Sequence, residues 1–186
     1  IWLTIPVIQK FGQRISEIRI NHDQNWNEQH FKSIYHHYHF SAYYNSYKAQ
    51  IEKLYLSPPS LLIDFNIRII LWICDELGIH PTFIRSSALS IEGSKTEHLL
   101  NICTKLHADT YLSPIGSSTY IEKNNLFENS DVLLQYQHFD HPHYHQIMDD
   151  FIPYLSTLDL LLNQGPVSME IIRSRRKDPY TSKDLY

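Results

Sequence analysis

The sequence lacks three features that would point to a particular class of protein. Lys and Arg number 16 against 20 Asp and Glu, a formal net charge of -4, so no basic excess is available to neutralise nucleic-acid phosphates. No apolar run reaches the roughly 20 residues that cross a bilayer. The two cysteines, Cys74 and Cys103, have no CxxC or ligand-spaced partner, which favours a reducing compartment such as the cytoplasm. We therefore expect neither non-specific nucleic-acid binding nor a membrane span.

Common catalytic motifs are absent as well. There is no P-loop, no GxGxxG and no GxSxG elbow, so an α/β-hydrolase triad is not expected. The length of 186 residues and the 42% hydrophobic content predict one domain that buries its own core. We assign this domain to residues 1–173, and we predict that the polar, aperiodic residues 174–186 form a disordered tail.

The apolar periodicity predicts alternating helices and strands. Helices are expected at 26–38, 42–56, 61–77, 96–106, 157–162 and from 168, and strands at 14–20, 81–84, 110–112 and 132–136. From Leu61 onward this order predicts an α/β fold of the three-layer Rossmann-like kind, with a mostly parallel sheet and helices on both faces. The sequence opens inside an apolar run, Ile1–Val7, typical of a buried strand. Because domain ends are usually exposed, we expect that the N-terminal strands of the sheet are missing.

Two loops after predicted strands carry groups suited to an anion. Arg85, Ser86 and Ser87 follow one strand, and residues 113–118, which include Ser113, Gly116 and Ser117, follow another. Ligands of open α/β sheets bind beyond the carboxyl ends of the strands, and backbone N–H groups at a helix start favour phosphate or carboxylate. Both loops can equally be plain strand-to-helix turns.

A metal site is a weaker interpretation of the histidines. They cluster in two groups: His36, His37 and His39, and then His141, His143 and His145. Imidazole suits zinc, but no Cys or acidic residue recurs nearby at ligand spacing, so we predict no metal. Ser156 and Asp159 have the spacing of a capping box, and we interpret both as caps of the following helix rather than as a catalytic pair.

Several short blocks, taken in order, resemble the WbqC-like protein family over Trp2 to Ser174. The blocks are Trp2–Val7, Leu77–Ile79 with Ser86 and Ser87, Lys95–Glu97, Tyr111–Pro114 with Gly116 and Tyr120, Tyr144 with Gln146, and Phe151–Gly165. A Met-Gln-Pro strand and a Gly-Tyr-Phe helix start of the family pattern are not present, which agrees with the expected missing strands.

The resemblance implies a bacterial enzyme of O-antigen or other surface polysaccharide biosynthesis. It suggests a transferase that moves a small group, for example glycyl or another aminoacyl group, to a sugar or sugar nucleotide. In this hypothesis Arg85, Ser86, Ser87 and the 113–118 loop bind an anionic substrate, Lys95 neutralises phosphate, and Tyr144 and Gln146 contact the sugar. Tyr120 joins the binding residues because it lies in a matching block. His98 and His141 are catalytic candidates by chemistry alone.

Two alternatives remain open at this stage. One is a nucleotide-binding enzyme of the nucleotidyltransferase kind, and the other is a non-catalytic sugar-binding or assembly subunit. The second draws on the tyrosines of residues 26–55, which suit an interface but also suit a packed helix pair. No cofactor is evident, and a nucleotide-linked sugar enters only as a substrate.

Overall fold

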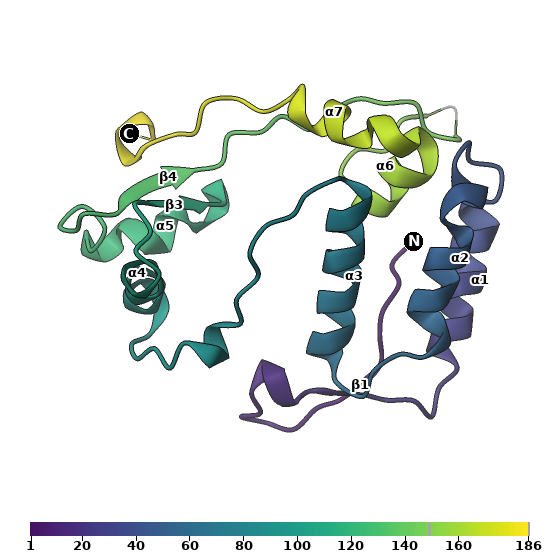
Figure 1. The fold of residues 1–186 in the computed structure, drawn as a ribbon, viewed down its shortest axis with the longest axis horizontal. Coiled ribbons are helices and arrows are strands. Elements are labelled where there is room, and N and C mark those ends of the chain that lie inside the picture. The colour runs from purple at the N-terminus through teal and green to yellow at the C-terminus, as the bar shows by residue number, and fades with distance from the viewer. Residues whose placement is uncertain (149, 186) are drawn as a thin grey trace. The chain divides into compact units, whose positions relative to one another are not determined.

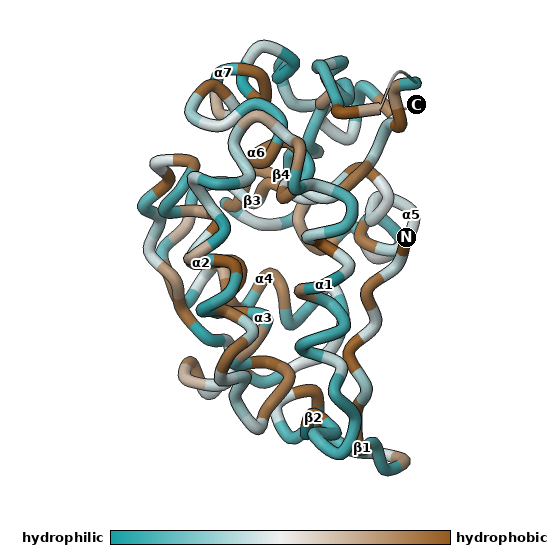
Figure 2. The backbone as a smooth tube through the Cα atoms, turned by 90° about the vertical axis from the view of Figure 1, so that its right-hand side faces the viewer, coloured by the Kyte–Doolittle hydropathy of each residue, from teal (hydrophilic) through white to brown (hydrophobic). Residues whose placement is uncertain are grey.

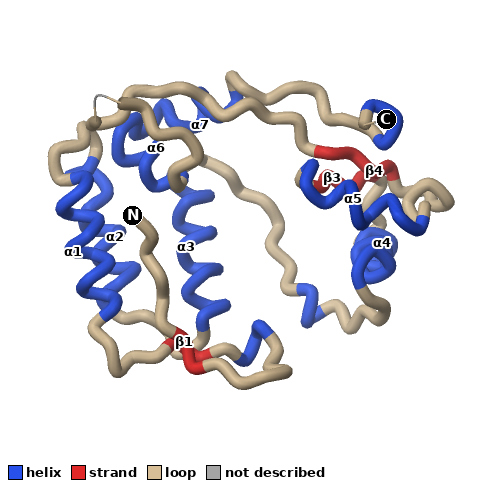
Figure 3. The backbone as a smooth tube through the Cα atoms, turned by 180° about the vertical axis from the view of Figure 1, so that it is seen from behind, coloured by secondary structure: helices blue, strands red, loops and turns tan. Residues whose placement is uncertain are grey.

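The chain folds into two compact units. A computed structural model describes residues 1–148 and 150–185. Unit 1 comprises Ile1–His80 and His141–Arg173, and unit 2 comprises Pro81–Asp140 and Ser174–Tyr186. Figure 1 traces the elements along the chain, and Figure 3 colours them by type.

Unit 1 is mainly helical. Its elements are β1 (Val7–Ile8), β2 (Arg19–Ile20), α1 (Trp26–Tyr38), α2 (Tyr44–Leu56), α3 (Leu62–Glu76), α6 (Thr157–Gln164) and α7 (Ser168–Arg173), with 3-10 turns at Ile15–Glu17 and Gly165–Val167. The strands β1 and β2 pair in antiparallel fashion, with Val7 opposite Ile20. The helices α1 and α2 lie side by side (Figure 1).

The core of unit 1 forms because its helices carry apolar residues three and four positions apart. One buried cluster contains Ile34, Tyr44, Tyr47, Ile51, Leu77, Leu161 and Leu162. A second contains Ile20, Trp26 and Phe65, and there the ring of Phe65 meets that of Trp26 edge-on with centroids 5.4 Å apart. Apolar residues dominate α3, whereas α1 and α2, which face the viewer in Figure 2, mix both kinds.

The position of α6 against α2 depends on a glycine. Tyr43, just before α2, donates its backbone N–H to the carbonyl of Leu162 at 3.0 Å. Gly165 ends α6 with φ of 56° and ψ of -130°, a conformation that L side chains rarely adopt. A Cβ at this position would overlap the ring of Tyr43, with Cγ 2.5 Å away. Only glycine therefore allows this close approach.

Unit 2 contains a short parallel sheet and one long helix. Its elements are α4 (Lys95–Lys105), β3 (Thr110–Ser113), α5 (Ser118–Ile121) and β4 (Leu133–Tyr136), with 3-10 turns at Ser86–Ala88, Ile115–Ser117, Glu122–Asn124 and Ser182–Asp184. Strands β3 and β4 are parallel, with Thr110 opposite Leu133 and Ser113 opposite Tyr136. The core gathers Cys103, Ile121, Phe127, Val132, Leu134 and Tyr136.

Part of the predicted tail lies in unit 2. Tyr180 exchanges two backbone hydrogen bonds with Tyr136, at 2.7 and 2.9 Å, so residues near position 180 extend the edge of β4. A further isolated bridge joins Phe139 and Arg176. The single domain over residues 1–173 and the disorder of residues 174–186 stay predictions.

The predicted helices are confirmed within one or two residues at most ends, and the chain is a mixed α/β protein. The three-layer Rossmann-like sheet is not confirmed, because the sheets among the described residues have two strands each. The strand predicted at Pro81–Ile84 is wrong, since these residues are exposed and unpaired in an extended segment. The strand expected over Ile1–Val7 is also wrong in its burial: Trp2 is 94% exposed and pairing starts only at Val7.

The reason is that the apolar face of α3 packs mainly against other helices of unit 1, and the strand residue in its buried clusters is Ile20 of the two-stranded sheet. Helical periodicity determines which face is buried, but it does not determine what covers that face. In the part of the chain that the structure describes, no helix combines the length and apolar character needed to cross a membrane.

Candidate functional site

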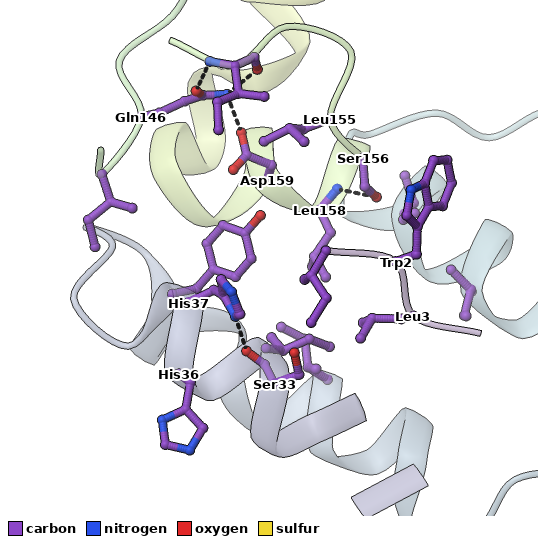
Figure 4. A pocket seen from close by; sticks show the side chains of 18 of the residues that line it. Trp2, Leu3, Ser33, His36, His37, Gln146, Leu155, Ser156, Leu158 and Asp159 are labelled. Atoms are coloured by element: carbon purple, nitrogen blue, oxygen red, sulfur yellow. Dashed lines mark hydrogen bonds between the residues drawn. The ribbon is translucent and has the colours of Figure 1, made fainter. Parts of the chain in front are cut away.

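Unit 1 contains a cavity of about 750 Å³. Its walls come from the N-terminal segment, α1, α2, α3, the loop before α6 and the start of α6 (Figure 4). Most lining side chains are apolar or aromatic, which is typical of small-molecule sites. They are Ile1, Trp2, Leu3, Ile34, Tyr38, Ile51, Leu54, Tyr55, Ile69, Trp72, Ile73, Ile147, Met148, Ile152, Pro153, Tyr154, Leu155 and Leu158, together with the polar or titratable Ser33, His36, His37, Gln146, Ser156 and Asp159.

One carboxylate, Asp159, organises the polar end of the cavity. It is 3% exposed. Its Oδ2 accepts hydrogen bonds from the Tyr144 hydroxyl at 2.8 Å and from Gln146 Nε2 at 3.0 Å. Its Oδ1 accepts from Asn163 Nδ2 at 3.2 Å. Figure 4 shows Gln146 and Asp159 facing one another on the side of the cavity away from Trp2.

Local sequence explains why these groups meet. Ser156 is the N-cap of α6, and its Oγ accepts from the backbone N–H of Leu158 at 3.2 Å, which fixes where the helix starts. Asp159 and Asn163 are four residues apart and therefore lie on one face of α6. The capping-box prediction is correct for Ser156 and wrong for Asp159, because the Asp159 carboxylate turns to Tyr144 and Gln146 rather than to the helix start.

Gln146 holds the loop against this helix. Its Nε2 donates to the carbonyl of Ile152 at 2.9 Å as well as to Asp159, and its Oε1 accepts from the backbone N–H of Ile152 at 2.7 Å. Both amide protons are thus in use, and the side chain is buried. We conclude that Gln146 is a positioning residue, which ties residues 146–152 to Asp159.

Burial and the Asp159 carboxylate also determine the pKa values of the nearby tyrosine hydroxyls. Burial, followed by the hydrogen bond to Asp159 and its negative charge, raises the pKa of Tyr144 well above its usual range. Burial, and then the charge of Asp159, raises the pKa of Tyr38 in the same way. Burial alone raises the pKa of Tyr55 to about 12. All three hydroxyls therefore stay protonated and neutral near pH 7.

Neutral donors surround the Asp159 carboxylate. An ionised carboxylate offers about four lone-pair sites. Two on Oδ2 are taken by Tyr144 and Gln146, and one on Oδ1 is taken by Asn163. The Tyr38 hydroxyl is a further donor to this carboxylate, and both Asp159 and Tyr38 line the cavity.

Of the predicted residues in unit 1, the structure brings Tyr144 and Gln146 together on Asp159. Tyr144 is not among the cavity-lining residues, so it acts on the cavity through Asp159. His141 packs among aromatic rings, and its Nε2 accepts from the backbone N–H of Tyr154 at 3.0 Å. That bond places the proton of the neutral ring on Nδ1, which is buried and without a hydrogen-bond partner. The catalytic role of His141 stays a prediction.

The remaining predicted residues belong to unit 2. They divide by exposure: Arg85, Ser86, Ser87, Lys95, Gly116 and Tyr120 are exposed, His98 is half-buried, and Ser113 and Ser117 are buried. The structure joins Ser113 and Ser117, whose Oγ atoms lie 2.6 Å apart, while the Ser117 hydroxyl donates to the carbonyl of Pro114 at 2.6 Å. Ser113 is then the donor to Ser117, and neither hydroxyl retains a proton for an anion. The anion site of unit 2 stays a prediction.

The histidines do not assemble a metal site in the described ranges. No three His, Cys, Asp or Glu side chains there come together in a way that could hold an ion. His37 and His39 each donate Nδ1 to a backbone carbonyl one turn earlier, of Ser33 at 2.8 Å and Tyr35 at 3.0 Å.

Comparison with known proteins identifies the family. The model of the WbqC-like protein family matches residues 1–171. The chain belongs to the WbqC-like family. A relative described as "Uncharacterized protein Rv1507c", from Mycobacterium tuberculosis, is 27% identical over 179 residues, which are 95% of this WbqC-like chain and 77% of that protein. No solved structure is significantly similar to the chain.

Sequence reasoning missed the centre of this site. Asp159 was interpreted as a cap, and Tyr38 and Asn163 were not singled out. The family resemblance offered one signal for this site. Two of its blocks contain the residues that meet here: one has Tyr144 and Gln146, and the other has Asp159 and Asn163. Nothing in their spacing shows that a loop residue and a helix residue 13 positions apart share a hydrogen bond.

Proposed function

We propose that this WbqC-like protein is a cytoplasmic transferase of bacterial surface polysaccharide biosynthesis, which transfers a small acyl group to a sugar bound in the cavity of unit 1. The observation that supports the proposal most directly is the buried Asp159 carboxylate, which is held by neutral donors at the polar end of an aromatic cavity. A site with few, fixed polar groups in an otherwise apolar wall orients one face of a small ligand.

The aromatic wall suits a sugar ring. Tyr38, Tyr55 and Trp72 line the cavity from three different helices. The C–H faces of a pyranose are apolar and pack on aromatic rings, while its polar edge requires hydrogen-bond partners. The Asp159 carboxylate supplies an acceptor at one end of the cavity, so the ring has a preferred orientation.

In this proposal Asp159 acts as the general base. The sugar group to be acylated, a hydroxyl or an amino group, donates to Oδ1. As its oxygen or nitrogen bonds to the carbonyl carbon of an activated acyl donor, its proton passes to Oδ1. The bond between that carbon and the leaving group then breaks, and the leaving group takes the proton from Asp159. General-base catalysis of this kind contributes on the order of 10²–10⁴-fold.

The test is acyl transfer by the purified protein to a panel of sugars and sugar nucleotides, with acyl and aminoacyl thioesters as donors and mass spectrometry of the product as the readout. We expect the Asp159→Asn variant to lose at least about 100-fold in kcat. The matched control is Asp75→Asn, which removes an exposed carboxylate from α3 and should keep full activity. Sugar binding without transfer by the wild type would instead identify a sugar-binding subunit, and transfer unchanged by Asp159→Asn would refute the base.

The predicted anion-binding residues of unit 2 are tested separately. Replacement of Arg85 and Lys95 by Ala should abolish binding of a sugar nucleotide measured by calorimetry, if these side chains neutralise its phosphates. If both variants bind the sugar nucleotide as tightly as the wild type, Arg85 and Lys95 take no part in its binding.

A further inference from the structure

The titratable side chains with a potential charge in the cavity lining are Asp159, His36 and His37 among the described residues. Asp159 is the single carboxylate among the described lining residues, and no Lys or Arg side chain is among them. The donors to Asp159, namely Tyr38, Tyr144, Gln146 and Asn163, are all neutral. Over the described part of the chain, no ion pair joins Asp159 to a cation.

A buried carboxylate of this kind is stabilised by its donors but not neutralised. Burial of an ionised carboxylate is costly unless it is paired, and neutral hydrogen bonds offset only part of that cost. The cavity therefore has a negative potential at its polar end, in a low-dielectric surrounding where charges interact more strongly than in water. A ligand that places a positive charge there regains part of the desolvation cost.

The side chains beside Asp159 also favour a ligand with a positive charge. Tyr38, Tyr55 and Trp72 line the cavity, and the faces of aromatic rings attract cations. Tyr38 stays protonated beside Asp159 because burial and the carboxylate raise its pKa, so it adds an oxygen acceptor and no second charge. An ammonium has three N–H donors and no acceptor, which matches a site that offers acceptors at its end and rings along its sides.

We propose that the cavity of unit 1 binds a primary ammonium group that pairs with the Asp159 carboxylate, and that its natural ligand is an amino sugar. The sugar part of this statement rests on the proposed function, whereas the ammonium part rests on the cavity alone. Ligands with a carboxylate or phosphate at this end are rejected, because they would meet Asp159 with no cation between them.

The test uses three probes of nearly equal shape on the full chain: benzylamine, benzyl alcohol and benzoate. Each has the aromatic body that the walls accept, and they differ in the charge at one end. Affinities are measured by calorimetry near pH 7, where benzylamine is protonated. Because the ammonium of benzylamine adds a positive charge opposite Asp159, whereas benzyl alcohol offers only a neutral donor, we expect benzylamine to bind at least about tenfold more tightly than benzyl alcohol and benzoate not to bind.

The Asp159→Asn variant should bind benzylamine and benzyl alcohol equally, and Asp75→Asn should keep the wild-type preference. Tryptophan fluorescence verifies that each variant is folded. If Asp159→Asn does not fold, the affinities of the three probes for the wild type are sufficient to test the ammonium site. Equal affinity for amine and alcohol, binding of benzoate, or no binding of the amine would overturn the ammonium site.

A parallel measurement with D-glucosamine and D-glucose separates this inference from the proposed function. Acyl transfer to glucose together with no preference for amines would overturn the ammonium site and leave the transferase standing. A clear preference for both benzylamine and glucosamine with no transfer to any sugar would support the ammonium site and overturn the transferase.

Discussion

The hydrogen bond between Tyr144 and Asp159 can be removed with almost no change of shape, by Tyr144→Phe. The hydroxyl lies 2.8 Å from Oδ2, with Tyr144 7% and Asp159 3% exposed. Phenylalanine keeps the ring, so no cavity forms beyond the space of one oxygen. Hydrogen bonds to a charged group contribute about 1.5–3 kcal/mol, and Asp159 keeps its bonds to Gln146 and Asn163. We therefore expect the free energy of unfolding to fall by about 2 kcal/mol.

The assay is urea unfolding followed by tryptophan fluorescence. The three tryptophans, Trp2, Trp26 and Trp72, all belong to unit 1, so the signal reports the unit that contains the bond. The matched control is Tyr154→Phe in the same loop, whose side chain is 81% exposed and whose loss of the hydroxyl should cost less than about 0.5 kcal/mol.

If Tyr144→Phe and Tyr154→Phe had the same free energy of unfolding, the hydrogen bond between Tyr144 and Asp159 would not stabilise the protein. A double-mutant cycle with Asp159→Asn adds a second criterion, because residues that share a direct bond should show a coupling energy of about 0.5–3 kcal/mol. A coupling of zero would mean that the two groups do not interact in solution.

Three further predictions concern unit 1. Gly165→Ala should lower its free energy of unfolding by about 3 kcal/mol or more, because a Cβ there overlaps Tyr43 and the backbone conformation is unfavourable for alanine; urea unfolding checks this. Phe65→Ala should cost about 3–5 kcal/mol, since this fully buried ring packs on two others, and a thermal melt unchanged from the wild type would contradict it. Tyr38 and Tyr144 have pKa values raised above the ordinary 10.0, so the unfolded chain releases their protons first. The contribution of these two groups to the free energy of unfolding is complete below pH 10 and is lost as the pH rises above it, by up to about 1.4 kcal/mol per pH unit for each proton. In urea unfolding measured as a function of pH, the slope of the free energy of unfolding against pH should be smaller for Tyr144→Phe than for the wild type.

Two of the perturbed residues, Asp159 and Gly165, lie in α6 or at its end. The side chain of Asp159 joins α6 to the 141–156 loop, and Gly165 at the other end of α6 lets the helix approach Tyr43. A change at either end is therefore expected to move the carboxylate that forms the polar end of the cavity. This is how residues far from the cavity can alter its chemistry.

Local patterns in the sequence were sufficient for most elements. The helix over Trp26–Tyr38 follows from apolar residues at helical spacing, and the helix that starts after Ser156 follows from its cap. The strands at Thr110–Ser113 and Leu133–Tyr136 coincide with the short apolar segments predicted at 110–112 and 132–136. The family resemblance, carried by short blocks in a specific order, agrees with the family model over residues 1–171.

Tertiary structure alone decided what covers each apolar face and which distant residues meet. The periodicity of α3 is the same whether a sheet or other helices pack on it. The sequence therefore favoured a layered sheet, whereas in the structure mainly helices, together with Ile20 of β2, cover this face. The same holds for Asp159: its spacing from Ser156 is compatible with a cap, and only the path of the 141–156 loop brings Tyr144 and Gln146 to its carboxylate. Local spacing determines which face a side chain occupies, whereas the hydrogen bonds between segments distant in sequence depend on how the whole chain packs.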